Sequence, residues 1–132
     1  MIYPMFAMFV LTCLIGLLAV AVRINSVRNG SVRPRFYQLM QGQDVPELVT
    51  KTTRCINNMF EVPTLFYAVS VLYIAVGVNS DVAVGLAWCF VALRLLQAVI
   101  HLSYNHVLHR MVSFFLGLAC LAGLWGILLG SL

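Results

Sequence analysis

The residues best suited to chemistry form two short polar groups inside long apolar stretches. The first group is Arg54, Asn58 and Glu61, whose offsets of four and seven residues place all three on one face of an α-helix. Arg54 and Glu61 are two turns apart, so each needs a partner from another helix or a ligand. Ionisable residues inside a membrane mark a site, a pathway or a paired network. The group could therefore form a structural salt-bridge network or bind a ligand.

The second group is Arg94, Gln97 and His101, with Tyr104 one turn further along. Offsets of three and seven residues again define one helical face. Arg94 lies near the middle of an apolar segment and needs a counter-ion, and Glu61 is the only carboxylate at a comparable depth. Two interpretations stay open. One is an Arg94–Glu61 pair that fixes helix packing, and the other is a cationic cleft that holds an anionic ligand.

Arg110 is a third candidate because it opens the last apolar segment. A basic side chain at a helix N-terminus opposes the helix dipole, so it gains nothing from that position. It is either an interfacial anchor or a cation that stabilises a bound thiolate or carboxylate. The three histidines, His101, His106 and His109, have no cysteine or carboxylate nearby in sequence to complete a ligand set, so we expect no metal site.

The composition indicates what kind of protein must position these residues. Of the 132 residues, 62% are hydrophobic and 9% are charged, and the mean hydropathy is +0.98. A soluble domain averages about 45–50% apolar residues. We predict an all-α integral membrane protein, a single domain of residues 1–132 with four transmembrane helices. Their approximate ranges are 3–27, 47–78, 82–104 and 110–131.

The distribution of basic residues predicts the topology. Arg23, Arg28, Arg33 and Arg35 crowd the loop after the first helix, Arg110 lies at the junction of the last two helices, and the opposite side has no Lys or Arg. By the positive-inside rule, both of these junctions are cytoplasmic and the two termini face the other side. The net charge of +4 does not indicate nucleic-acid binding, because the cations gather at helix ends.

The run from Arg54 to Pro63, on the second of the four helices, resembles the R-x-x-x-N-x-x-E signature of the MAPEG family. These are the membrane-associated proteins of eicosanoid and glutathione metabolism. Arg94 and Arg110 have the separation of two further family arginines, and Arg23 matches another basic position. The resemblance covers nearly the whole chain, and the segment from His101 to Arg110 is similar to a bacterial branch of the family.

The resemblance implies a homotrimer of four-helix subunits that binds glutathione between neighbours. The activity would be that of a glutathione transferase or peroxidase acting on hydrophobic electrophiles, in the lipids of a bacterial inner membrane. Arg110 would face the glutathione sulfur, since a nearby cation raises the thiolate fraction. The residues assigned to the remainder of the glutathione site are Arg23, Arg54, Asn58, Glu61, Arg94 and His101, to which the polar face of the third helix adds Gln97 and Tyr104.

Three positions depart from the family pattern. Gln97 stands where His or Tyr is frequent, His101 where Tyr is usual, and Phe114 where some members use Tyr against the ligand. These departures favour an alternative function, a non-catalytic lipid-binding scaffold or accessory subunit with the same fold. The alternative predicts that Arg54, Glu61 and Arg94 neutralise one another and leave no room between them.

Overall fold

The computed structural model describes residues 1–132, and every regular element in it is a helix. The elements are α1 (Ile2–Arg28), α2 (Phe36–Leu39), α3 (Glu47–Val76), α4 (Asp81–Leu102) and α5 (Val107–Gly130). Four of them are long and apolar enough to cross a membrane. The shortest of the four, α4, has 22 residues and is about 33 Å long, which spans a hydrocarbon core of about 30 Å. The fold is that of a multi-pass, four-helix membrane protein, as the sequence predicts.

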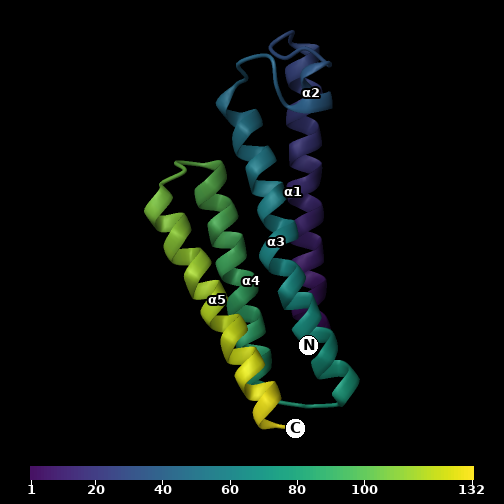
Figure 1. The fold of residues 1–132 in the computed structure, drawn as a ribbon, viewed down its shortest axis with the longest axis vertical. Helices are drawn as coiled ribbons and strands as arrows, with labels where there is room; N and C mark the ends of the chain where they lie inside the picture. The colour runs from purple at the N-terminus through teal and green to yellow at the C-terminus, as the bar shows by residue number, and fades with distance from the viewer.

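The four long helices form two antiparallel hairpins (Figure 1). One hairpin pairs α1 with α3 and the other pairs α4 with α5, and these two interfaces are the most extensive in the molecule. Both chain termini and the α3–α4 turn lie at one end of the bundle. The α1–α3 connection and the α4–α5 turn lie at the opposite end, which we call the loop end.

Aromatic side chains hold the two hairpins together in the middle of the bundle. The rings of Phe66 on α3 and Phe90 on α4 are stacked, with centroids 4.6 Å apart. Closer to the termini, the buried Tyr73 hydroxyl donates a hydrogen bond of 2.7 Å to the backbone oxygen of Leu124 on α5. The outward side chains of the long helices are mostly apolar and exposed, which suits contact with lipid.

The turn between α3 and α4 begins two residues earlier than predicted. Gly77 adopts a left-handed φ of 74° and ends α3, a conformation that glycine reaches without the penalty of a Cβ atom. The N-cap of α4 is Ser80, whose hydroxyl oxygen accepts a hydrogen bond from the amide of Ala83 at 3.2 Å. Asp81 lies in the first turn of α4, where its negative charge interacts favourably with the helix dipole.

The junction between α4 and α5 also begins two residues earlier than predicted. α4 ends at Leu102 rather than near residue 104, and Asn105 turns the chain with a φ of 52°. α5 begins at Val107, so Arg110 does not open the helix but is its fourth residue. The amide of Arg110 already donates to the carbonyl of His106 at 3.2 Å, and only its side chain is available for a ligand.

The connection from α1 to α3 contains a short helix, α2, that the sequence analysis does not anticipate. Phe36 packs with Val32 and Val49 in a small apolar cluster of its own. The hydroxyls of Ser26 and Tyr37 lie 2.7 Å apart and link the end of α1 to α2. These contacts fold the basic loop over the loop end of α1 and α3.

Candidate functional site

The centre of the candidate site is Arg94, a cation with only 1% of its surface exposed. Its Nη2 donates to the backbone oxygen of Asn58 on α3 at 2.9 Å, and its Nη1 donates to the side-chain oxygen of Gln97. The guanidinium carbon lies 5.8 Å from the ring centroid of Phe90 and 5.9 Å from that of Phe114, within the range of a cation–π contact. Backbone, amide and aromatic groups therefore hold this charge.

No carboxylate pairs with Arg94 inside the protomer. The only salt bridge joins Lys51 to Glu47 within α3, and Glu61 is exposed. Of the two interpretations left open by the sequence, the Arg94–Glu61 pair is therefore wrong for a single chain, because the two side chains do not come within salt-bridge distance. The same finding removes the mutual neutralisation of Arg54, Glu61 and Arg94 that the scaffold alternative predicts.

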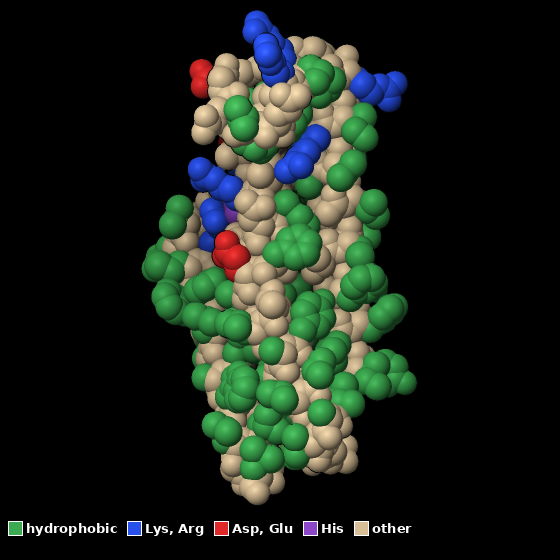
Figure 2. Space-filling model, turned by 45° about the vertical axis from the view of Figure 1, so that its right-hand side comes forward, with side chains coloured by type: hydrophobic (Ala, Val, Ile, Leu, Met, Phe, Trp, Pro, Cys, Tyr) green, Lys and Arg blue, Asp and Glu red, His purple; other side chains and the backbone are tan.

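Arg54 and Glu61 project from an open face of α3. Both are exposed and neither makes a side-chain hydrogen bond or ion pair. In Figure 2, basic, acidic and histidine side chains gather in one band below the loop end, with apolar side chains beneath them. Charged side chains without a partner are costly within a membrane-spanning helix, and they mark a candidate site or a paired network.

His101 lies on the same face of α4 as Arg94 and is equally buried, with 1% of its surface exposed. Its Nε2 has no hydrogen-bond partner. A buried polar atom without a protein partner costs free energy, so Nε2 of His101 is a candidate to bind water, a ligand or another polar group. Arg94 thus contacts Gln97 on its own helix and the Asn58 backbone on α3, and His101 lies two turns further along the same face of α4.

Arg110 and Tyr104 belong to the α4–α5 turn instead. Arg110 donates from Nη1 to the side-chain oxygen of Asn105 at 2.8 Å, and its Nε has no partner. Tyr104 is exposed, and its hydroxyl lies 3.0 Å from Nδ1 of His109. The ring of His106 lies close to that of His109, with centroids 4.5 Å apart and a tilt of 39° between the ring planes. No three His, Cys, Asp or Glu side chains meet in a cluster that could hold a metal ion.

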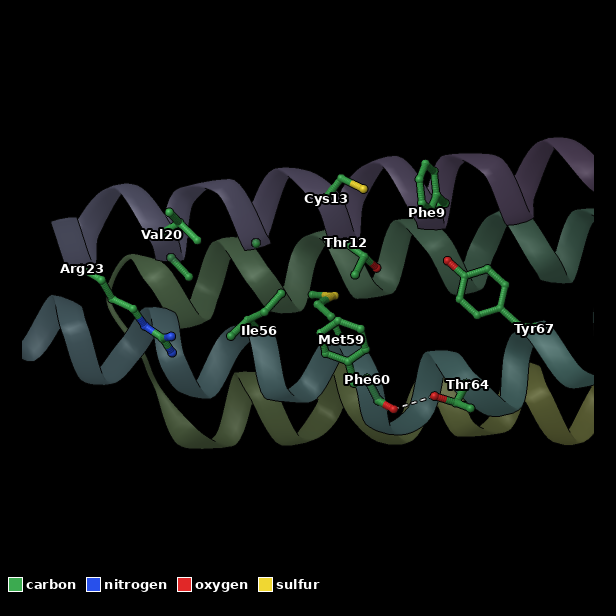
Figure 3. A pocket seen from close by; sticks show the side chains of 12 residues that line it. Phe9, Thr12, Cys13, Val20, Arg23, Ile56, Met59, Phe60, Thr64 and Tyr67 are labelled. Atoms are coloured by element: carbon green, nitrogen blue, oxygen red, sulfur yellow. Dashed lines mark hydrogen bonds between the residues drawn. The ribbon is translucent and has the colours of Figure 1, made fainter. Parts of the chain in front are cut away.

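Arg23 faces a separate cavity. It stands at one end of an apolar groove of about 550 Å³ between α1 and α3, with Tyr67 and Thr64 towards the other end (Figure 3). Its Nη2 donates to the hydroxyl of Thr53 at 3.4 Å, and its guanidinium lies 5.7 Å from the ring centroid of Tyr37. This groove uses a different face of α3 from Arg54 and Asn58, so one protomer does not bring Arg23 to Arg94.

Comparison of the whole sequence with models of known protein families shows which family the chain belongs to. The MAPEG family model matches residues 1–130. The chain belongs to the MAPEG family. Neither a curated protein nor a solved structure matches it.

MAPEG membership accounts for the position of the R-x-x-x-N-x-x-E signature on α3. Arg54 and Glu61 extend from one face of that helix, while the backbone of Asn58 receives Arg94 from α4. Family membership and the four apolar helices together support a multi-pass membrane protein.

Two features of this MAPEG chain are not predicted from its sequence, the Lys51–Ser103 contact and the groove between α1 and α3. Lys51 donates to the backbone oxygen of Ser103 at 2.9 Å, across 52 residues of sequence. Its i, i+4 spacing from Glu47 and its seven-residue offset from Asn58 could have indicated its place on this face. No sequence pattern indicates the groove between α1 and α3, because the apolar residues that line a groove have the same character as those that face lipid.

Proposed function

We propose that this protein is a membrane glutathione transferase-like or peroxidase-like enzyme. It conjugates or reduces hydrophobic electrophiles with glutathione that binds between the subunits of a homotrimer. The proposal places the chain in a bacterial inner membrane, with the loop end on the cytoplasmic side where glutathione is available.

The observation that carries the proposal is the uncompensated charge of Arg94. A cation with 1% exposure normally has a carboxylate partner, because desolvation of a charge is costly. Here Arg94 has none, and Arg54 and Arg110 add two further unpaired cations on the same side of the molecule. A tripeptide with two carboxylates supplies the missing negative charge, and guanidinium groups recognise carboxylates with charge-assisted hydrogen bonds.

The groove between α1 and α3 supports a second, hydrophobic substrate. Its walls are largely apolar side chains, among them Ile56, Met59 and Phe60, and its volume of about 550 Å³ is that of a typical small-molecule site. Arg23 borders this groove and reaches the Arg94 cluster only if a neighbouring subunit completes the site. The proposed trimer therefore brings both substrates together at the subunit boundary.

In the transferase reaction, Arg110 would stabilise the glutathione thiolate by its positive charge. The thiolate sulfur forms a bond to the electrophilic carbon, and the leaving group departs with the electron pair of its bond. In the peroxidase reaction, two glutathione molecules are oxidised to the disulfide while a hydroperoxide is reduced to an alcohol and water. Both reactions need the same thiolate, so the same cation serves both.

The decisive experiment measures glutathione binding and turnover in the purified protein. Calorimetric titration in detergent with glutathione up to millimolar concentration reports binding, and conjugation of a chromogenic aryl halide reports catalysis. We expect saturable binding and a glutathione-dependent rate. Absence of both overturns the proposal, and light scattering of the same sample tests the trimer.

One observation favours the alternative, a lipid-binding scaffold or accessory subunit without catalysis. The Asn58 backbone and the Gln97 side chain already occupy both terminal nitrogens of Arg94, which leaves less capacity for a ligand carboxylate. The same titration separates the two functions. Saturable glutathione binding excludes the scaffold, whereas a fixed stoichiometric protein partner without glutathione binding establishes it.

A further inference from the structure

Lys51 links the two helical hairpins at the loop end. Its Nζ donates to the backbone oxygen of Ser103 at the end of α4 at 2.9 Å, and it lies 2.9 Å from Oε1 of Glu47. The Lys51 side chain is 15% exposed, whereas that of Glu47 is 79% exposed. Lys51 thus reaches inward from α3 to the other hairpin, while Glu47 stays in solvent.

The polar residues between α3 and α4 form a narrow seam with two closed ends. Lys51, Cys55 and Asn58 have offsets of four and seven residues and share one face of α3. The Lys51–Ser103 hydrogen bond closes the seam at the loop end, and the Arg94–Asn58 bond closes it about 10 Å deeper along α3.

Two reactive side chains are enclosed in this seam. Cys55 and His101 are each 1% exposed, and His101 Nε2 has no hydrogen-bond partner. An anionic ligand therefore cannot touch His101 or Arg94 in the closed seam, because neither offers accessible surface. Binding requires the hairpins to separate locally.

We propose that Lys51 is a releasable strap that closes the loop-end entrance to the α3–α4 seam. Its release admits an anionic ligand to His101 and Arg94. The inference rests on the proposed function only for the identity of that anion, since access to the seam is measured without glutathione.

The contacts between the hairpins make this entrance the place that opens. Three side-chain hydrogen bonds join the two hairpins, donated by Lys51 and Tyr73 of α3 and by Arg94 of α4. The Tyr73 and Arg94 bonds are buried or partly buried, whereas the Lys51 bond is the exposed one. Exposed contacts of a charged side chain contribute little stability, so an incoming carboxylate that draws the Lys51 ammonium away from the Ser103 carbonyl releases the strap.

The test is the rate at which N-ethylmaleimide modifies each cysteine, followed by peptide mass spectrometry in detergent. Cys55 lies in the seam, and Cys120 is a buried cysteine on α5 outside it, so Cys120 is an internal control. Modification of a buried thiol follows the population of the open form when opening is fast. We expect Lys51→Met to raise the modification rate of Cys55 about fivefold. This rise is smaller than the full loss of a hydrogen bond to a charged group would give, because Lys51 is partly exposed. The modification rate of Cys120 should not change.

Two further variants make the result specific to the strap. Lys51→Arg keeps a cation that reaches Ser103 and should restore protection of Cys55. Arg35→Met removes one exposed positive charge from the loop and should leave Cys55 protected. An unchanged Cys55 rate in Lys51→Met, or an equal rise at Cys120, would overturn the strap.

Discussion

Arg94 of α4 donates a hydrogen bond of 2.9 Å to the backbone oxygen of Asn58 on α3. The next carbonyl along α3, that of Met59, lacks its usual helical donor because Pro63 has no amide hydrogen. The buried guanidinium is therefore solvated by backbone and side-chain dipoles, and the positive charge is retained. A structural ion pair would have cancelled that charge, whereas this arrangement retains it for an anion that enters when the seam opens.

Arg94→Met separates a structural role of this cation from a binding role. Methionine removes the desolvation cost of a buried charge, which offsets the loss of the hydrogen bonds to Asn58 and Gln97. We expect the variant to fold with unchanged or higher thermal stability in detergent. Its affinity for glutathione should fall at least about tenfold, the loss expected for a hydrogen bond to a charged group, as measured by calorimetric titration.

Leu95→Met is the matched control for this substitution, because Leu95 is exposed on the next position of α4. It should change neither stability nor affinity. Full glutathione affinity in Arg94→Met would remove Arg94 from the binding site.

Glu61→Gln tests whether Glu61 is a structural counter-ion or a ligand contact. If Glu61 were the counter-ion of a buried arginine, its loss would cost about 3–5 kcal/mol. Glu61 is exposed and unpaired in the protomer, so we expect the unfolding free energy to change by less than about 1 kcal/mol. Glutathione affinity should fall, because the carboxylate is free to accept from the ligand's ammonium group.

Glu47→Gln is the control for Glu61→Gln, since Glu47 is exposed and pairs only with Lys51. Thermal unfolding and light scattering of both variants provide the measurement. A large loss of stability or of the oligomer in Glu61→Gln alone would mean that a neighbouring subunit supplies a buried cation to Glu61.

The sequence predicts the four long helices because their apolar runs are uninterrupted and charges gather at their ends. It also predicts which residues of one helix share a face, as shown by the Arg94–Gln97 hydrogen bond on α4, because helical spacing fixes direction around the axis. Spacing does not fix distance between helices. For that reason it leaves the Arg94–Glu61 pair open, which the single chain does not form, and it does not show that Arg23 faces its own groove.

Local turn chemistry explains the remaining differences. The starts of α4 and α5 depend on which residue adopts the capping conformation, and Ser80 rather than Asp81 does so. Helix α2 is held by packing of Phe36 on Val32 and Val49, a tertiary contact that four residues of sequence do not reveal. The Lys51–Ser103 hydrogen bond depends likewise on how the two hairpins meet.

Arg110→Ala tests the residue expected to face the glutathione sulfur. Because a nearby cation favours the thiolate, we expect a smaller ultraviolet thiolate signal of bound glutathione at a given pH, with the fold retained. The substitution also frees the side chain of Asn105, which Arg110 contacts at 2.8 Å.

Asn105→Gly controls for that second effect. It removes the amide partner, keeps the positive charge and tolerates the φ of 52° at this position. Its thiolate signal should match that of the parent protein. An unchanged titration in Arg110→Ala would leave Arg110 as an interfacial anchor.

Gly16→Leu tests the groove between α1 and α3 as the site of the hydrophobic substrate. Gly16 lines the groove, and a Cβ atom placed there would meet Ile56 Cδ1 at an ordinary contact distance of 3.6 Å. The longer leucine side chain should therefore occupy the groove without disrupting the helix pair. We expect a higher KM for a bulky hydrophobic electrophile and unchanged glutathione affinity.

Gly85→Leu is the matched substitution on α4, where an added Cβ meets nothing within 4 Å. It should leave both constants unchanged. If Gly16→Leu left the KM of the bulky electrophile unchanged, the groove would hold no part of the substrate. A change in oligomer mass with Gly16→Leu would instead show that another subunit covers the groove.

Tyr73→Phe tests how the two hairpins are held together away from the candidate site. The Tyr73 hydroxyl donates to the Leu124 backbone at 2.7 Å, and Tyr73 is 2% exposed. Hydrogen bonds between membrane helices contribute about 0.6 kcal/mol on average and up to about 1.7 kcal/mol. We expect a loss of about 1 kcal/mol in the unfolding free energy, measured by denaturant titration in detergent.

Tyr3→Phe is the control, because Tyr3 is exposed, and it should show no loss of unfolding free energy. The Tyr73 variant should keep its glutathione affinity because this bond lies at the other end of the bundle from the α3–α4 seam. A stability equal to that of the parent would mean that the interface between the hairpins rests on packing, with the Phe66–Phe90 stack as its main contact.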